Sequence, residues 1–402
     1  MTTPLPTSPT TLIYSARALR DFGDGFIVLL LPVYLSSLGF DAFQIGIVAT
    51  LALLGSALTT LAIGMIGTTY STRTLLIASS ALMTLTGLAF IASTITPLIF
   101  VIAFIGTINP SSGSVSIFVP LEHSALSHSV TDANRTRSFA RYSVVGALAA
   151  ALGSLAAASP EYIALTGITP QTSLQLMFAF YAALGLTAGA IYARMPRQAG
   201  QTQVPPKPLG PSRSIVIKLA ALFSIDAFAG GFVVQSLMAL WLFDKFELSL
   251  TTAGMFFFVS SLLAAVSMPI ASWLATRIGL VNTMVWTHIP SSVCLIAAAI
   301  APTLELALTL LLIRAALSQM DVPTRSSYVM AVVTPEERTA AASVTSVPRS
   351  LAAAASPAIA GALFATGYTA LPFIICGVLK IAYDIALLWT FRHVKPPEER
   401  RA

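Results

Sequence analysis

Apolar residues fill most of the chain in long runs that short polar stretches separate. A helix needs about 20 mostly apolar residues to cross the hydrocarbon core of a membrane. Six such runs lie in the first half of the chain and six in the second, at roughly 12–38, 43–67, 74–94, 97–120, 139–158, 173–193, 214–243, 250–275, 280–300, 303–331, 340–364 and 370–391. The pattern predicts an all-α membrane protein with twelve transmembrane helices in two six-helix bundles.

Composition supports this prediction and excludes a soluble protein. Hydrophobic residues make up 56% of the chain and charged residues 9%, and the mean hydropathy is +0.83. Soluble domains carry roughly 25% charged residues. The formal net charge is +6, but no Lys/Arg cluster with interleaved aromatic residues is present. We therefore expect membrane lipid as a partner, no nucleic acid, and a monomer.

The basic residues predict the orientation of the chain in the membrane. Cytoplasmic loops carry an excess of Lys and Arg. One set of loops and ends holds Arg73, Arg135, Arg137, Arg194, Arg197, Lys207, Arg213, Arg277, Arg338, Arg392, Lys395, Arg400 and Arg401. The alternate set holds only Lys245, together with Asp41, Glu161, Asp244, Glu247 and Glu305. Both termini are therefore predicted to lie in the cytoplasm, with the chain in the cell membrane.

The two halves of the chain share sequence at a regular offset. The letters VP at 119–120, S at 124, VT at 130–131 and RT at 135–136 recur 203 residues later. The letters GF at 25–26 and V at 28 recur 206 residues later. Transporters are commonly built from such repeats. We predict bundles at 1–194 and 214–402, joined by a proline-rich cytoplasmic linker at 195–213.

The first predicted span holds four ionisable residues, Arg17, Arg20, Asp21 and Asp24. The spacings i,i+4 predict the pairs Arg17/Asp21 and Arg20/Asp24, which would neutralise one another. A second interpretation has Asp24 facing a cavity and binding a proton, because ionisable residues inside a membrane are commonly functional. The sequence leaves both interpretations open.

Asp226 lies at a similar depth in the seventh span and has no arginine one turn away. Such an acid either finds a partner on another helix or is protonated. This makes Asp226 the stronger single candidate for proton coupling. A salt bridge to a neighbouring span is the structural alternative.

The tenth span holds Arg314 in its middle, without an acid nearby, and the i,i+4 neighbours Asp321 and Arg325. The fixed charge of Arg314 requires an acid or an anionic ligand. At the offset of 203, Arg325 corresponds to Glu122 in the fourth span. We expect these two opposite charges to face each other across the bundles and to open and close as an ion pair.

Further polar residues interrupt the spans. The run NPSSGS at 109–114 breaks the fourth span, and non-helical backbone at membrane depth is tolerated only inside protein or beside water. We expect it to line a cavity. In the twelfth span, Lys380 and Asp384 have the i,i+4 spacing of a structural pair.

Two loops carry the residues of a known family. Residues 272–279, SWLATRIG, and 64–73, GMIGTTYSTR, resemble the G-x-L-A-D-R-x-G-R-R signature of the major facilitator superfamily. Thr68 and Thr276 stand where that signature has aspartate, so a charged latch of the family's kind is not expected here. Residues 310–314, LLLIR, and 356–361, SPAIAG, are looser likenesses to elements of its proton-driven exporters.

The resemblance implies twelve helices, alternating access and a small-molecule substrate. We predict a secondary transporter whose function is proton-linked efflux of a small molecule. The alternative transporter function is uptake or exchange of a small organic or inorganic anion. The alternative of a different class is a non-transporting membrane sensor. No enzyme activity, cofactor or metal is predicted. The candidate residues are Asp24, Asp226 and Asp21 for proton coupling, Asn109, Ser111, Gln235, Arg314 and Gln319 for the cavity, and Arg20, Glu122, Asp321 and Arg325 for gating.

Overall fold

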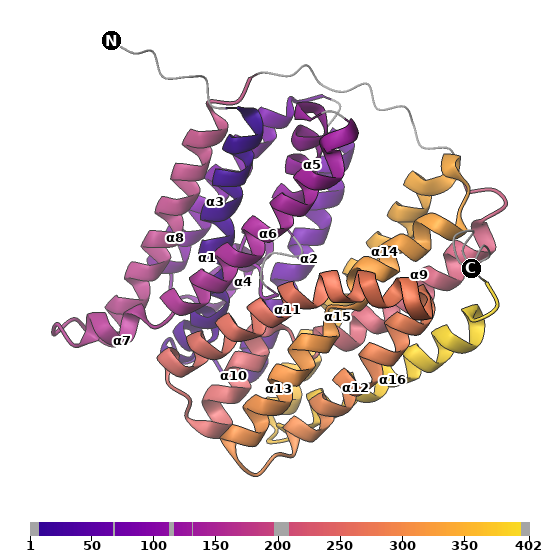
Figure 1. Cartoon of the computed structure of the whole chain (residues 1–402). Helices are drawn as coiled ribbons and strands as arrows, with labels where there is room; N and C mark the ends of the chain where they lie inside the picture. Colours follow the sequence, from indigo (N-terminus) through magenta and orange to yellow (C-terminus); the bar gives the residue numbers. More distant parts are fainter. Residues whose placement is uncertain (1–7, 67–68, 112–115, 131, 197–208, 395–402) are drawn as a thin grey trace. The chain divides into compact units, whose positions relative to one another are not determined.

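The computed structural model describes residues 8–66, 69–111, 116–130, 132–196 and 209–394, and in these ranges the regular structure is helical. The helices of the first half are α1 Pro9–Ser37, α2 Ala42–Ile66, α3 Thr72–Ala92, α4 Thr96–Ile105, α5 Phe118–Ser129, α6 Asp132–Ala156, α7 Ser159–Ala164 and α8 Pro170–Tyr192 (Figure 1). The second half contains α9 Arg213–Gly231, α10 Gln235–Phe246, α11 Leu250–Ile278, α12 Leu280–Ala299, α13 Leu304–Ser318, α14 Asp321–Val332, the short 3-10 helix η1 Pro335–Glu337, α15 Arg338–Ala365 and α16 Leu371–Phe391. The predicted all-α class is confirmed.

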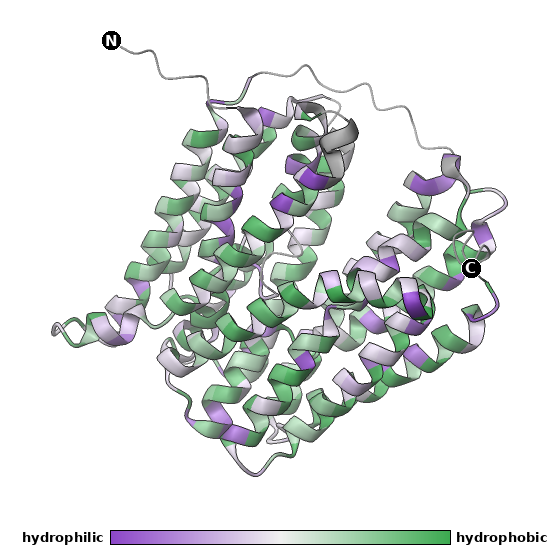
Figure 2. Cartoon of the chain, viewed as in Figure 1, coloured by the Kyte–Doolittle hydropathy of each residue, from purple (hydrophilic) through white to green (hydrophobic). Residues whose placement is uncertain are grey.

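Ten helical stretches of the described chain are long and apolar enough to cross a membrane. Hydrophobic residues cover most of their length (Figure 2). The two remaining predicted spans fall short for reasons visible in the sequence. α1 is long enough but carries Arg17, Arg20, Asp21 and Asp24, and the fourth span is divided into α4 and α5.

Three spans are interrupted, and only one of these breaks was predicted. In the fourth span α4 ends at Ile105 and α5 begins at Phe118. Of the expected polar run, 109–111 are not helical and 112–114 lie outside the described residues. The span also continues to Ser129, beyond the predicted end at 120. The seventh span breaks between α9 and α10, and the tenth between α13 and α14. Glycines at the end of α9 and the polar Gln319 at the end of α13 weaken the helix there.

Contacts divide the chain into two compact units. Unit 1 consists of 1–39, 51–203 and 248–258, and unit 2 of 40–50, 204–247 and 259–402. The predicted borders of the two bundles stay a prediction, and residues 197–208 of the linker lie outside the described residues. Within unit 1, α1 packs against α6, α8 and α5, and α3 against α8. Within unit 2, α9 packs against α15 and α16, and α12 against α16, α13 and α14.

Glycine allows a close helix contact in each unit, at equivalent positions of the repeat. Gly25 on α1 lies against the carbonyl oxygen of Ala150 on α6, where an added methyl group would overlap the oxygen. Gly231 on α9 meets the carbonyl oxygen of Ala353 on α15 in the same way. Only glycine permits this approach of two backbones. The repeated glycine in the sequence therefore reflects a repeated packing contact.

A carboxylate in unit 1 holds the beginning of α11. Glu161 on α7 accepts hydrogen bonds from the backbone amides of Leu250 and Thr251, at 2.6 and 3.2 Å. The hydroxyl of Thr251 donates to the same carboxylate at 2.6 Å. A negative charge at a helix N-terminus satisfies free amides and interacts favourably with the helix dipole. This contact explains why the first turns of α11 belong to unit 1.

A second carboxylate ties the start of α9 to the segment before α15 in unit 2. Glu337 in η1 accepts hydrogen bonds from the backbone amides of Gly210 and Ser212 and from the hydroxyl of Thr334. Hydrogen bonds from Ser212, from the Gly210 amide and from Thr334 lower the pKa of Glu337 to about 2. The ionised form is the one that these donors stabilise.

We expect this connection to weaken in acid. Because the pKa of Glu337 in the folded chain lies below its ordinary value of 4.5, its contribution to stability is complete above that value and is lost as the pH falls toward 2. The thermal unfolding midpoint of the wild-type protein should therefore fall more steeply with pH below 4.5 than that of Glu337→Gln. Identical pH profiles for the two proteins would contradict the assignment.

Candidate functional site

A buried ion pair joins the first and fourth spans of unit 1. The guanidinium of Arg20 on α1 lies 2.5 Å from the carboxylate of Glu122 on α5, and both side chains are at most 1% exposed. Tyr142 donates to this carboxylate at 2.6 Å, and Tyr192 donates to its other oxygen at 2.5 Å. The ring of Phe118 lies 3.9 Å from the guanidinium carbon. The burial of this pair is tolerated because both of its charged groups have partners.

Unit 2 contains the same pair with the charges exchanged. Asp226 on α9 lies 3.2 Å from Arg325 on α14. Arg20 precedes Asp226 by 206 residues and Glu122 precedes Arg325 by 203, which are the two offsets of the repeat. The repeat therefore preserves an ion pair between the same two helices but reverses which helix carries the positive charge.

Glu122 and Arg325 thus each have partners inside their own unit, and their expected pairing across the bundles stays a prediction. Glu122 has its partners within unit 1, and Arg325 binds Asp226 and, at 2.9 Å, Asp321. Asp321 begins α14, and the predicted i,i+4 pair of Asp321 with Arg325 is present. The predicted pair of Arg17 with Asp21 is also present, at 2.6 Å.

The other predicted local pair in α1 is not formed, because Arg20 binds Glu122. Asp24 is left 5% exposed, with the Tyr181 hydroxyl 3.5 Å away as a hydrogen-bond donor. No ion pair reaches Asp24 from the described part of the chain. The Tyr181 oxygen lies 3.2 Å from the hydroxyl of Thr107, and the Thr107 amide donates to Thr86. Asp24 is thereby linked to the backbone of the break between α4 and α5.

Asp226, the stronger candidate from the sequence, has cations around it. The ammonium of Lys380 on α16 lies 2.6 Å from one carboxylate oxygen, and Arg325 contacts the other. Lys380 does not pair with Asp384, as its spacing suggested; Asp384 lies 3.0 Å from His288 on α12. His288 and Asp384 are functional candidates that the sequence did not identify, because the partners are 96 residues apart.

Four of the five predicted cavity residues lie at the breaks in the helices. Asn109 is buried between α4 and α5 and accepts a hydrogen bond from the Ser111 amide at 2.8 Å. Gln235 is the first residue of α10 and Gln319 caps α13, and both are partly buried. Their assignment to a substrate cavity stays a prediction.

Arg314 lies in the middle of α13 and is partly buried. Within the described ranges, no hydrogen bond or ion pair joins its guanidinium to another residue; only its backbone oxygen accepts a bond, from Ser291 at 3.4 Å. The requirement for a partner, which the sequence predicted, is therefore not met by an acid of the described chain.

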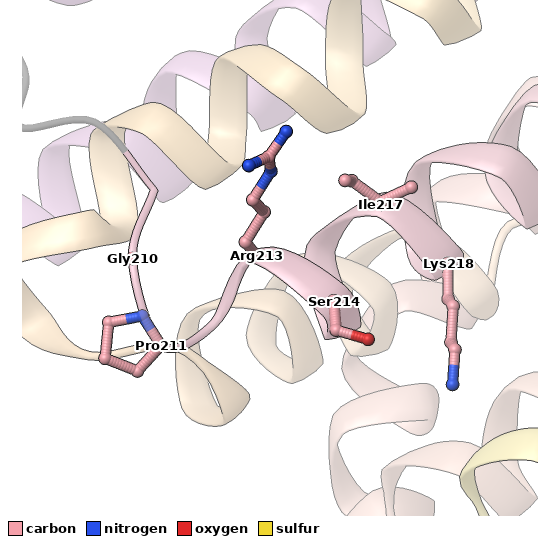
Figure 3. Close-up of a pocket in the computed structure, with 6 residues that line it drawn as sticks. All are labelled: Gly210, Pro211, Arg213, Ser214, Ile217 and Lys218. Atoms are coloured by element: carbon pink, nitrogen blue, oxygen red, sulfur yellow. The ribbon is translucent and has the colours of Figure 1, made fainter.

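One open pocket lies at the beginning of α9 but lacks the features of a binding site. It has a volume of about 520 Å³ and is lined by Gly210, Pro211, Arg213, Ser214, Ile217 and Lys218. The charged ends of Arg213 and Lys218 point in different directions (Figure 3). Both residues are exposed, so the cations do not converge on a ligand.

The apolar helices are those of a polytopic membrane protein, and the comparison with known families gives its class, a membrane transporter. The chain matches the model of the Major Facilitator Superfamily over residues 13–313 and 220–402, and it belongs to this family. It is 25% identical to the uncharacterized membrane protein YJR124C of Saccharomyces cerevisiae (strain ATCC 204508 / S288c), over 94% of this chain and 93% of that protein.

Solved transporters share the fold. The nucleoside transporter NupG superposes with a TM-score of 0.73 and 16% identity, over 96% of this chain and 99% of that chain. The inward open xylose transporter XylE from E. coli gives a TM-score of 0.74 and 13% identity, over 95% and 96% of the two chains. At these identities the likeness concerns the fold alone.

We expect Glu122→Gln to destabilise the protein by about 3–5 kcal/mol, because it leaves the Arg20 charge buried without its partner. The double variant Arg20→Met/Glu122→Leu should recover most of this loss. Unfolding of purified protein in detergent measures both effects.

Glu305→Gln is the matched control, since Glu305 is exposed in the first turn of α13. Its effect should stay below about 1 kcal/mol. Equal effects of the two glutamine variants would show that the buried pair has no special role.

Proposed function

We propose that the chain is a proton-coupled secondary transporter that exports a small molecule. The observation that supports this most directly is the state of Asp24. It is a buried carboxylate on a membrane-spanning helix, and no ion pair reaches it within the described residues. An ionised carboxylate in such a place carries a large desolvation cost, which proton binding removes.

Asp226 is a poorer proton carrier in this structure. Its carboxylate has contacts with both Lys380 and Arg325. An adjacent cation stabilises the ionised form of a carboxylate. We therefore assign the coupling proton to Asp24 and a structural role to the charge of Asp226, which reverses the order suggested by the sequence.

The surroundings of Asp24 also supply a way for its charge to affect the helices. Its hydrogen-bond donor, Tyr181, lies next to Thr107 in the non-helical backbone after α4. A change in charge at Asp24 would change the hydrogen bond with Tyr181 and, through it, the contact with this break. Broken spans in transporters commonly border substrate and ion sites.

Direction and location rest on the sequence. Export follows from the resemblance to proton-driven exporters, and the excess of Lys and Arg in one set of loops supports cytoplasmic termini. We further propose the cell membrane as the location and a single chain as the working unit.

Asp24→Asn should abolish coupling while it preserves binding. A resistance screen with drugs, metalloids and metabolites first supplies a transported compound. In proteoliposomes, an imposed pH gradient should accelerate wild-type transport of this compound, and the Asp24→Asn protein should lose at least tenfold of that gradient-driven rate. Exchange of the compound without a gradient should persist, because asparagine cannot bind the proton but fills the same space.

Asp41→Asn is a matched control, because Asp41 is exposed and caps the start of α2 through the amide of Gln44 at 2.8 Å. Asparagine is an equally good cap, so this variant should couple normally. Wild-type transport that is indifferent to the pH gradient would refute the proposed function.

Arg314 favours a second candidate function, the transport of a small anion. Its guanidinium is permanently charged, and no acid of the described chain neutralises it. An anionic substrate would supply the missing charge. The rest of the proposed mechanism is independent of this choice of substrate.

Arg314→Gln should then weaken the binding of small anions at least about 100-fold, because a charged hydrogen-bonded contact is worth roughly 3 kcal/mol. Neutral compounds should bind as before, and Arg314→Lys should retain part of the affinity. Calorimetry with a panel of carboxylates, phosphate and neutral analogues tests this. Arg213→Gln, which changes an exposed arginine, is the control, and equal losses in both glutamine variants would refute the anion site.

A further inference from the structure

His288 lies in a buried charged cluster of unit 2 that the proposed function does not use. The residue is 3% exposed, on α12. Its Nδ1 lies 3.0 Å from the carboxylate of Asp384 on α16. Its Nε2 lies 3.4 Å from the ammonium of Lys380 and 3.9 Å from the carboxylate of Asp226. Both nitrogens of the ring therefore face charged groups.

In the ion pairs of this cluster, one carboxylate has no permanently charged cation beside it. Three carboxylates, those of Asp226, Asp321 and Asp384, meet two permanent cations, Lys380 and Arg325. Asp384 is 0% exposed, and neither of these cations forms an ion pair with it in the described part of the chain. A buried charge without compensation is costly. A protonated His288 supplies the missing charge directly beside Asp384.

The neighbouring helices bring no further permanent cation into an ion pair with Asp384 in the described part of the chain. α13 contributes the backbone of Arg314 beside Ser291, and α14 contributes Asp321 and Arg325, which are paired with each other. From α16 the ring of Tyr383 approaches His288, with centroids 6.2 Å apart. Farther away, Arg349 on α15 interacts with Arg325, Asp226 and Asp321, but it is exposed.

The two ring nitrogens give His288 two distinct hydrogen-bond patterns. In the neutral ring, Nδ1–H donates to Asp384 and the lone pair of Nε2 accepts a hydrogen bond from Lys380. A second proton on Nε2 removes that acceptor and makes Nε2 a donor. The nearest acceptor is then the Oδ1 atom of Asp226, which also binds Lys380 at 2.6 Å.

We propose that His288, held by Asp384, is a proton-binding site of unit 2, and that proton uptake there weakens the contact of Lys380 with Asp226. Asp384 is the positioning residue, since it fixes the ring and stabilises the cation. The role of this site in transport rests on the proposed proton coupling, but the binding of the proton does not. Because a protonated Nε2 no longer accepts a hydrogen bond from Lys380, the ammonium of Lys380 can then bind another partner.

Nitrogen-15 NMR of histidine in full-length protein in lipid nanodiscs tests the proposal with the proton itself as the ligand. The chain has four histidines. Replacing His123, His128 and His393 by glutamine leaves His288 as the only source of signal and leaves the cluster intact. Between about pH 8 and pH 5, where histidine changes charge, the signal should change from that of a neutral ring to that of a cation.

Asp384→Asn in this background should move the transition toward lower pH by about one unit or more, because the anion that stabilises the cation is gone. Tyr383→Phe is the matched control. It changes a buried side chain next to His288 whose hydroxyl has no hydrogen-bond partner among the described residues, and it should leave the transition in place. A signal that stays the same from pH 8 to pH 5, or that Asp384→Asn does not shift, would overturn the proposal.

The outcomes separate this site from the proposed function. If Asp24→Asn uncouples transport while His288 keeps one charge state, the proposal of a proton site at His288 is refuted and the proposed function stands. If His288 gains a proton as expected but wild-type transport ignores the pH gradient, the proposed function fails and the site stands.

Discussion

A charge inside a membrane must have its partner nearby, and this constraint determines how each unit is built. In unit 1 a buried ion pair, Arg20 with Glu122, joins the first and fourth spans of the chain. In unit 2 the equivalent pair, Asp226 with Arg325, joins the seventh and tenth spans. Such a pair is costly to desolvate and still more costly to break. The two helices are therefore held together by a contact that has no adequate substitute from water or lipid. Next to this contact, each unit also contains a group that the pair leaves uncompensated.

The uncompensated groups differ between the units, and the difference follows from the reversed polarity of the pairs. In unit 1, Arg20 on α1 forms its ion pair with Glu122. Asp24 therefore lacks an ion pair within the described chain, and it lies beside Tyr181. In unit 2 the acid is on α9, so Lys380 and His288 gather around it. The candidate proton sites thus have opposite chemistry, a carboxylic acid in one unit and an imidazole in the other. One duplicated scaffold has produced two different environments for a proton.

The sequence predicted the features that depend on local spacing or on the membrane. Apolar runs gave the helical class, and the i,i+4 pairs of Arg17 with Asp21 and of Asp321 with Arg325 are present in the structure. The same rule failed for Lys380 with Asp384. A competing partner lies on another helix, and spacing along the chain contains no information about such neighbours. The break between α9 and α10 was missed for a related reason, because apolar residues continue through it.

The reversed ion pairs also restrict how the gene can change after its duplication. Repeated sequences exchange segments by recombination, which keeps the copies alike. If the coding segment of α1 replaced that of α9, an arginine would stand at the position of Asp226, beside both Arg325 and Lys380. Three buried cations would then meet without Asp226, with only Asp321 left beside Arg325, and the unit would be strongly destabilised. Once the polarity had reversed, the two repeats could no longer exchange these segments and were committed to separate evolutionary histories.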